Sequence, residues 1–408
     1  MKKLLAVIFF SLGVISISQA QTWSRMQGWG LDLEASHWVN SQKVVAVGEN
    51  LIIYSENAGS SWLEVVQEFE VRFNDVTFSN ESIGIAVGET GTIYRTTDGG
   101  KTWAKITSGT VKNLKSVISV GENQLFASGE DGILLSSINS GASWNVLITN
   151  TTLDLQEIFF VDENLGFIAA EGGNVFRTSN KGTSWEKIQL ATVRNLNGIV
   201  FTSNLIGYVV GDLGTFFRTT DGGNTWTSVP TNVTARLKKI AASPVDNRIL
   251  VAVGDQATAI RSINSGSTFG TVNLGAGNLR NLHQLGFIPA TNTLLAFGQN
   301  GYIISSTNAG TNWTTRQAGI RNDFSSTDFK STTVGFLSGK NGEFYVTTNG
   351  GVSLISRPLP EKINIHSIDF WNTSFGYASS ESGKMYRTAN SGSTWVPVPS
   401  NTPNKITG

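Results

Sequence analysis

The sequence contains no cysteine, and proline, histidine and methionine are also scarce. Among its 408 residues are 8 prolines, 3 methionines and 3 histidines. The lack of cysteine excludes disulfide bonds, thiol catalysis and lipid attachment through a cysteine. With only His37, His283 and His366 available, a histidine-based metal site is improbable. We therefore expect no metal and no cofactor.

The sequence also lacks an excess of charge of either sign. Lysine and arginine together number 30, as do aspartate and glutamate, so the formal net charge is zero. A nucleic-acid-binding chain usually carries a basic excess that attracts phosphates. We therefore expect no nucleic-acid partner.

Only the N-terminus carries a long apolar run. Lys2 and Lys3 precede the apolar stretch 4–14, and Ser18-Gln19-Ala20 has the small-residue spacing of a cleavage site. This pattern predicts a signal peptide over residues 1–20 and a secreted or periplasmic mature protein. The run is short for a bilayer span, and no later segment is long or apolar enough, so we expect a protein that does not span the membrane.

What the sequence has in abundance is an internal repeat. A hydroxyl residue, an Asp or Asn, a Gly and an aromatic recur at fixed offsets nine times, as in the stretch 96–103, Thr-Thr-Asp-Gly-Gly-Lys-Thr-Trp. The Asp/Asn positions of this box are Asn57, Asp98, Asn139, Asn180, Asp221, Asn264, Asn308, Asn349 and Asn390. They are 41 residues apart in six intervals, and 43 and 44 apart in the other two. A repeat of this length with strand-like sequence between copies is typical of a β-propeller.

Each repeat has room for four short strands. In the third repeat these are predicted over residues 114–120, 124–128, 133–137 and 143–147, with a Gly-containing turn at 129–132. The prediction is an all-β fold: a single β-propeller of about nine four-stranded blades spanning residues 21–400. Residues 401–408 resemble the beginning of a further first strand, which leaves a ten-bladed ring open. We expect nine complete blades in one ring.

The box has a structural explanation. Its Asp or Asn side chain can accept hydrogen bonds from backbone N–H groups just downstream and so close the hairpin between the third and fourth strands. The aromatic that follows is expected to pack between neighbouring blades. Tryptophan fills that place in seven repeats, whereas Phe269 and Leu354 replace it in the sixth and eighth. Because nine equivalent hairpins cannot form one asymmetric active site, we assign the boxes a structural role.

These motifs resemble the Asp-box repeat and, in their fuller form, the photosystem II stability/assembly factor family. The fuller form is Leu-x-x-Ile-x-Phe, Gly-Phe/Tyr, Val-Gly-Glu-x-Gly and the box; it is visible at residues 155–160 with 166–167 and at 196–201 with 207–208. Sortilin-type and sialidase propellers are more distantly similar. The resemblance covers residues 21–400 and implies a non-catalytic, photosynthesis-related assembly factor that binds a protein or peptide segment.

A sialidase-like enzyme is the sharpest catalytic alternative. The Phe/Tyr-Arg-Ile-Pro motif of that family is absent, and the arginines three residues before the box recur along the chain, which indicates a scaffold role. These arginines are Arg95, Arg177, Arg218, Arg261 and Arg387. We expect no catalytic residues. The alternative that remains is a cell-surface propeller that binds or hydrolyses glycans.

Two repeated charge patterns suggest where a partner could bind. The turn between the second and third strands carries an acid in seven repeats: Glu49, Glu89, Glu130, Glu171, Asp212, Asp255 and Glu381. The link into the first strand carries a base in most: Arg72, Lys112, Arg194, Arg236, Arg280 and Arg321. Strand alternation places both sets on the face opposite the boxes. We interpret the basic set as a partner-binding surface; local turn chemistry and solvation are the competing explanation.

Overall fold

The computed structural model describes residues 32–274, 280–317 and 324–399, apart from positions 332, 340–341, 349–354 and 381. The expected signal peptide (1–20), residues 401–408, Arg321, the box residue Asn349, Leu354 and Glu381 lie outside the described residues.

Seven four-stranded antiparallel sheets follow one another along the first three quarters of the chain. The first contains β1 (Leu33–Trp38), β2 (Val44–Gly48), β3 (Leu51–Ser55) and β4 (Leu63–Glu64). The second contains β5 (Phe73–Phe78), β6 (Gly84–Gly88), β7 (Ile93–Thr96) and β8 (Ala104–Ile106). The third contains β9 (Leu114–Val120), β10 (Gln124–Gly129), β11 (Leu134–Ser137) and β12 (Asn145–Leu147). The fourth contains β13 (Leu155–Phe160), β14 (Gly166–Ala170), β15 (Asn174–Thr178) and β16 (Glu186–Gln189).

The remaining sheets have the same strand order. The fifth contains β17 (Leu196–Phe201), β18 (Gly207–Gly211), β19 (Phe216–Thr219) and β20 (Thr227–Ser228). The sixth contains β21 (Leu237–Ala242), β22 (Leu250–Gly254), β23 (Ala259–Ser262) and β24 (Gly270–Thr271). The seventh contains β25 (Leu282–Phe287), β26 (Leu294–Gly298), β27 (Tyr302–Ser306) and β28 (Thr314–Gln317). Two further sheets contain β29 (Phe324–Phe329), β30 (Gly335–Gly339), β31 (Phe344–Thr347) and β32 (Ile355–Ser356), then β33 (Ile365–Phe370), β34 (Gly376–Ser380), β35 (Met385–Thr388) and β36 (Val396–Val398).

One-turn 3-10 segments join the second and third strands of five sheets. They are η1 (Glu89–Gly91), η2 (Glu130–Gly132), η3 (Glu171–Gly173), η4 (Asp212–Gly214) and η5 (Gln299–Gly301). Among the described residues no helix is long and apolar enough to cross a membrane. The all-β prediction with nine four-stranded blades is therefore confirmed.

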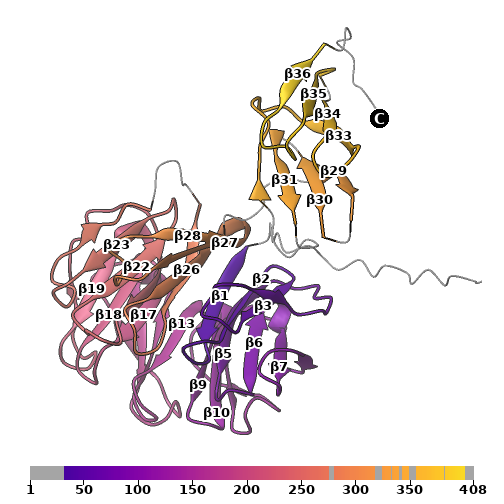
Figure 1. Ribbon diagram of the computed structural model, residues 1–408. Helices are drawn as coiled ribbons and strands as arrows, with labels where there is room; N and C mark the ends of the chain where they lie inside the picture. The colour runs from indigo at the N-terminus through magenta and orange to yellow at the C-terminus, as the bar shows by residue number, and fades with distance from the viewer. Residues whose placement is uncertain are drawn as a thin grey trace, which may run out of the picture.

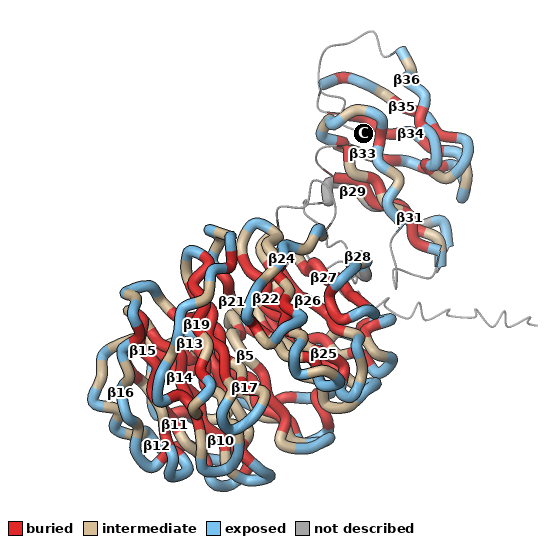
Figure 2. The backbone as a smooth tube through the Cα atoms, turned by 90° about the vertical axis from the view of Figure 1, so that its left-hand side faces the viewer, coloured by how far each residue is buried: buried red, intermediate tan, exposed pale blue. Residues whose placement is uncertain are grey.

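The first seven sheets close into a ring (Figure 1). The first strands β1, β5, β9, β13, β17, β21 and β25 each lie beside the next, and β25 lies beside β1. The second strand of every sheet in this ring is buried along its whole length, except for the partly buried Gln124 at the start of β10, so the core runs through the middle of the sheets (Figure 2).

The junction between the seventh and first sheets repeats the contacts made elsewhere in the ring. In other repeats, a main-chain N–H of the turn donates to a side-chain oxygen of the residue that opens the next repeat. The pairs are Thr90 with Asn113 at 2.7 Å, Asp131 with Asp154 at 3.0 Å, Gly172 with Asn195 at 3.1 Å and Gln256 with Asn281 at 2.9 Å. At the junction, the N–H of Asn300 donates to Asp32 Oδ1 at 2.9 Å. Trp62 of the first sheet also packs edge-on against Phe297 of the seventh, with ring centroids 5.7 Å apart.

The expectation that all nine blades share one ring is therefore corrected. The repeat period sets the number of sheets, but the fit between sheets decides where a ring closes, and it closes after seven. The eighth and ninth sheets pack against each other, with β29 beside β33, and stand apart from the ring (Figure 1).

Candidate functional site

A β-bulge near the start of each first strand shapes the central channel of the ring. In every sheet of the ring one residue of the first strand is left without a partner on the second strand. A bulge re-aims side chains, so this residue and the one after it both face the channel. The pairs are Glu34 with Ala35, Asn74 with Asp75, Lys115 with Ser116, Gln156 with Glu157, Asn197 with Gly198, Lys238 with Lys239 and His283 with Gln284.

All of these residues except Gly198 line a cavity of about 380 Å³ at one end of the channel. Arg72, Glu89, Asn113 and Glu130, from the links and from the second-to-third turns, complete its rim. The cavity therefore opens on the face that carries these loops, and we call this opening the mouth. Its lining residues are mostly polar or charged, and none of them is Phe, Tyr or Trp.

In several pairs the second residue ties neighbouring sheets together. Asp75 Oδ2 accepts hydrogen bonds from the backbone N–H of Val117 at 2.8 Å and from the Ser116 hydroxyl at 3.0 Å. Ser116 Oγ in turn accepts from the N–H of Ile158 at 3.3 Å, and Glu157 Oε2 accepts from the N–H of Ile199 at 2.7 Å. The same side chains therefore line the channel and hold the ring together.

Lys239 reaches past one sheet to pair with Glu157 two sheets away. The intervening sheet has Gly198 at the equivalent position, where a Cβ would lie only 3.0 Å from the Lys238 carbonyl oxygen. Burial raises the pKa of Asp75 and of Glu157, although the charge of Lys239 opposes the shift in both. Burial would lower the pKa of Lys239, but the charges of Glu157 and Asp75 outweigh it and raise that pKa. The ammonium group of Lys239 therefore stays charged between the carboxyl groups of Asp75 and Glu157.

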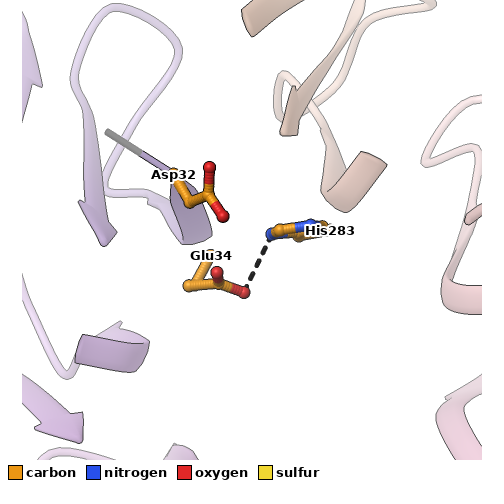
Figure 3. Close-up of side chains that lie close together, drawn as sticks. All are labelled: Asp32, Glu34 and His283. Atoms are coloured by element: carbon orange, nitrogen blue, oxygen red, sulfur yellow. Dashed lines mark ion pairs between the residues drawn. The ribbon is translucent and has the colours of Figure 1, made fainter. Parts of the chain in front are cut away.

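A second charged cluster lies where the ring closes (Figure 3). His283 Nδ1 lies 2.9 Å from Glu34 Oε2, and the Arg72 guanidinium pairs with Glu34 and lies 3.6 Å from Asp32 Oδ2. Burial alone would raise the pKa of Glu34, but the hydrogen bond from His283 and the charges of His283 and Arg72 outweigh it and lower that pKa. This network links the first and seventh sheets through charged side chains.

The same cluster has donor groups that could bind a divalent cation. One ligand atom each from Asp32, Glu34 and His283 lie within 4.8 Å of one another, and carboxylate with imidazole suits several metals. Arg72, however, already places a positive charge against both carboxylates. A cation would have to displace that guanidinium, so the arrangement favours an ion-pair network.

Comparison with known proteins places the ring in a family. The family model described as "Photosynthesis system II assembly factor YCF48" matches residues 54–188 and 179–318. The chain belongs to this family. The resemblance found in the repeats is therefore confirmed. The match to the YCF48 family ends at residue 318, just beyond β28. No protein with a curated description matches the sequence.

Solved structures of two kinds are similar to this YCF48-family chain. YCF48 from Cyanidioschyzon merolae is 17% identical, with a TM-score of 0.58; the match covers 68% of this chain and 96% of that one. An ancestral GH74 enzyme is 15% identical with a TM-score of 0.65, covering 93% of this chain and 64% of that one. The GH74 xyloglucanase from Xanthomonas campestris is 11% identical with a TM-score of 0.58, covering 91% and 80%. At these identities the likeness shows the fold alone.

Five of the six basic residues predicted to bind a partner are described, and they lie on the links around the mouth of this YCF48-family ring. Arg72 pairs with Glu34 and Asp32, Lys112 pairs with Asp131, and Arg236 Nε lies 2.8 Å from Asp212 Oδ1. Arg194 donates to the Leu213 carbonyl at 3.3 Å, and the Arg280 guanidinium lies 4.7 Å from the centroid of the Tyr302 ring. Lys112, Arg194 and Arg236 are thus held against the second-to-third turns, whereas Arg72 is held by the residues at the start of the first sheet.

The box residues lie on the opposite face and bond to their own hairpins. Asp98 Oδ1 accepts from the backbone N–H groups of Lys101 and Thr102 at 3.0 Å, and its Oδ2 accepts from the Thr102 hydroxyl at 2.6 Å. Asn57, Asn139, Asn180, Asp221, Asn264, Asn308 and Asn390 accept the equivalent backbone bond. In three sheets the repeated arginine donates to a carbonyl of the next sheet's box: Arg95 to Ser140, Arg177 to Gly222 and Arg261 to Ala309.

Sequence reasoning missed the channel-lining pairs, including Glu34, Asp75, Glu157, Lys239 and His283. Their signal was present in the family pattern Leu-x-x-Ile, because the two variable positions are the ones that face the channel. A polar pair inside an otherwise apolar strand is the feature to look for.

Proposed function

We propose that this chain is an exported, non-catalytic scaffold that binds a protein or peptide segment at the mouth of its ring. The observation that carries the proposal is the charged mouth, built from loops and first strands of a fold whose family is described as an assembly factor. A concave, polar opening at the centre of a propeller suits a charged segment of a partner.

A hydrolytic role is less well supported. Asp75 and Glu157 are two acids of the channel lining, but both accept backbone hydrogen bonds, and Glu157 pairs with Lys239. A glycosidase needs one carboxyl group free to donate a proton and another free to attack or to activate water. Because both acids are engaged in holding the ring, we propose that the chain is not an enzyme.

We propose export from the N-terminal pattern of residues 1–20, and we accordingly propose a partner in the periplasm or outside the cell. The family description names photosystem II; for this chain we propose the more general role of assisting the assembly of a partner protein. No cofactor or metal is needed for this role.

Charge reversal at the mouth tests the proposal. The triple variant Arg194→Glu, Arg236→Glu, Arg280→Glu should abolish capture of a partner identified by crosslinking in the producing cell, because several like charges at one opening attract cooperatively. Reversal of Lys101 and Lys181 on the box face is the matched control and should leave capture intact.

Two results would contradict the proposal. One is partner capture that survives the triple reversal in a protein whose melting temperature is unchanged. The other is release of reducing sugar from a β-glucan or a sialoside by the purified protein, with loss of that activity in Asp75→Asn or Glu157→Gln.

A further inference from the structure

The charges around the mouth are divided between two halves of the ring. The rim over the first four sheets carries exposed or partly exposed acids at Glu49, Glu68, Glu70, Glu89, Glu130 and Glu171. The three cations of that half, Arg72, Lys112 and Lys115, each pair with a carboxylate of the same half. The acids of the links and turns therefore remain in excess there. We call this part the acidic arc.

The mouth over the fifth to seventh sheets has the opposite balance. Its cations are Arg194, Arg236, Lys238, Lys239 and Arg280, whereas Asp212 and Asp255 are the only acids in the described links, turns and channel pairs of these sheets. In the seventh sheet the second-to-third turn carries Gln299 where other repeats have an acid. We call this part the basic arc.

The polar cavity of about 380 Å³ lies between the two arcs. Charges of one sign that line a concave opening with protein walls focus their field into it. Because the arcs carry opposite signs, the potential changes sign from one side of the mouth to the other.

We propose that the mouth recognises a segment whose own charges are segregated, with a basic stretch over the acidic arc and an acidic stretch over the basic arc. This inference rests on the proposed binding function and adds the chemical class of the partner segment. A segment of uniform charge satisfies one arc and is repelled by the other, and a segment with alternating charges satisfies neither.

Two synthetic peptides of identical composition test this proposal. Both contain four lysines and four glutamates spaced by Gly-Ser, grouped by sign in one peptide and alternating in the other. Fluorescence anisotropy with the full chain at low salt should show at least about tenfold tighter binding of the grouped peptide, the gain expected from a few exposed ion pairs. The preference should shrink at 0.5 M salt, because exposed charges are then screened.

Charge variants locate the effect. Glu68→Lys, Glu70→Lys, Glu89→Lys and Glu130→Lys together should remove the preference. The same four changes at Glu56, Glu81, Glu122 and Glu163 on the box face should preserve it. If the quadruple rim variant melts early, Glu68→Gln with Glu70→Gln, both on one exposed link, should still reduce the preference.

Equal affinity for the two peptides, or binding of neither, overturns the inference. If the partner is still lost on reversal of Arg194, Arg236 and Arg280, the mouth nevertheless binds it and the proposed function stands. A preference that persists in the rim variant but disappears in the box-face variant would assign recognition to the other face.

Discussion

The ring of seven sheets and the pair of sheets that follows it are built from the same repeat, but they differ in how far the side chain at one repeat position is exposed. The position lies on the second strand. Its residue pairs with the third-strand residue that comes three before the box Asp or Asn. It is Val45, Ile85, Phe126, Phe167, Tyr208, Val251 and Leu295 in the ring, and Phe336 and Tyr377 in the pair. The first eight side chains are at most 1% exposed, whereas Tyr377 is 51% exposed.

The reason is the neighbour that covers the position. In the ring this side chain packs against the box glycine of the next sheet, and Leu295 packs in this way against Gly59 of the first sheet. Tyr377 belongs to the ninth sheet, beyond which the described residues contain no further sheet, and Trp371 and Phe375 are also exposed. The comparison teaches that a sheet of this repeat buries both faces only when another sheet follows it.

The largest expected effect comes from emptying this position in the ring. Leu295→Ala should destabilise the ring by about 2–5 kcal/mol, because it leaves a cavity at the junction where the ring closes. Tyr377→Ala, at the same repeat position, should change stability by no more than about 0.5 kcal/mol. Urea denaturation followed by tryptophan fluorescence measures both. Equal losses would show that the ninth sheet is covered as fully as the ring.

A smaller effect is expected from filling the same junction. Gly59 has a φ of +77°, and a Cβ there would lie 2.6 Å from Leu295 Cδ2. Gly109 has a φ of +79° with no atom within 4 Å of its Cβ position. Gly109→Ala therefore reports the backbone cost alone, about 1–2 kcal/mol, and Gly59→Ala should cost about 1–3 kcal/mol more through overpacking. Equal melting temperatures of the two variants would argue against a tight junction.

The smallest effect concerns acid. Hydrogen bonds from Thr225 hold the pKa of Asp221 at about 2. Burial would raise the pKa of Asp98, but hydrogen bonds from Thr102, Thr96 and Lys101 outweigh it and hold that pKa at about 2. Both pKa values are lower in the folded than in the unfolded chain, so their stabilisation is present above about pH 4 and is lost as the pH falls towards 2.

This acid sensitivity should be confined to the ring, because the ninth sheet closes its hairpin with the amide of Asn390. Asp98→Asn with Asp221→Asn should flatten the pH dependence of ring stability between pH 4 and pH 2, as measured by thermal melts. Hydrogen exchange at the Asn390 hairpin should be the same in both proteins. An unchanged pH profile in the double variant would assign the acid sensitivity to other groups.

The sequence was sufficient to locate the sheets. The strands expected in the third repeat over 114–120 and 143–147 correspond to β9 and to a slightly shorter β12, because hydrophobic alternation and Gly turns are local properties. Closure after seven sheets was not predictable in this way. It depends on Trp62, Leu295 and Phe297 meeting across more than 230 residues of chain, which no local pattern records.

The candidate site was predictable only in part. The repeated bases and acids lie on the face where the cavity opens, because the links and second-to-third turns of a propeller emerge together; that a partner binds there stays a prediction. The channel pairs were missed, since alternation predicts one inward residue where the bulge presents two. The pairing of Lys239 with Glu157 depends further on Gly198 in the sheet between them.

The ring closes without any sheet that mixes distant parts of the chain. Each of its sheets is formed by four consecutive strands, and among the described residues no strand of the seventh sheet pairs with a strand of the first. The two sheets meet through side-chain packing and through hydrogen bonds between side chain and backbone, from the N–H of Asn300 to Asp32 and from the amide of Gln284 to the Ser36 carbonyl. No sheet therefore depends on which repeat comes first in the polypeptide chain. A circular permutant that begins at Lys112 and joins the seventh repeat to the first through a short linker retains every strand pairing of the ring.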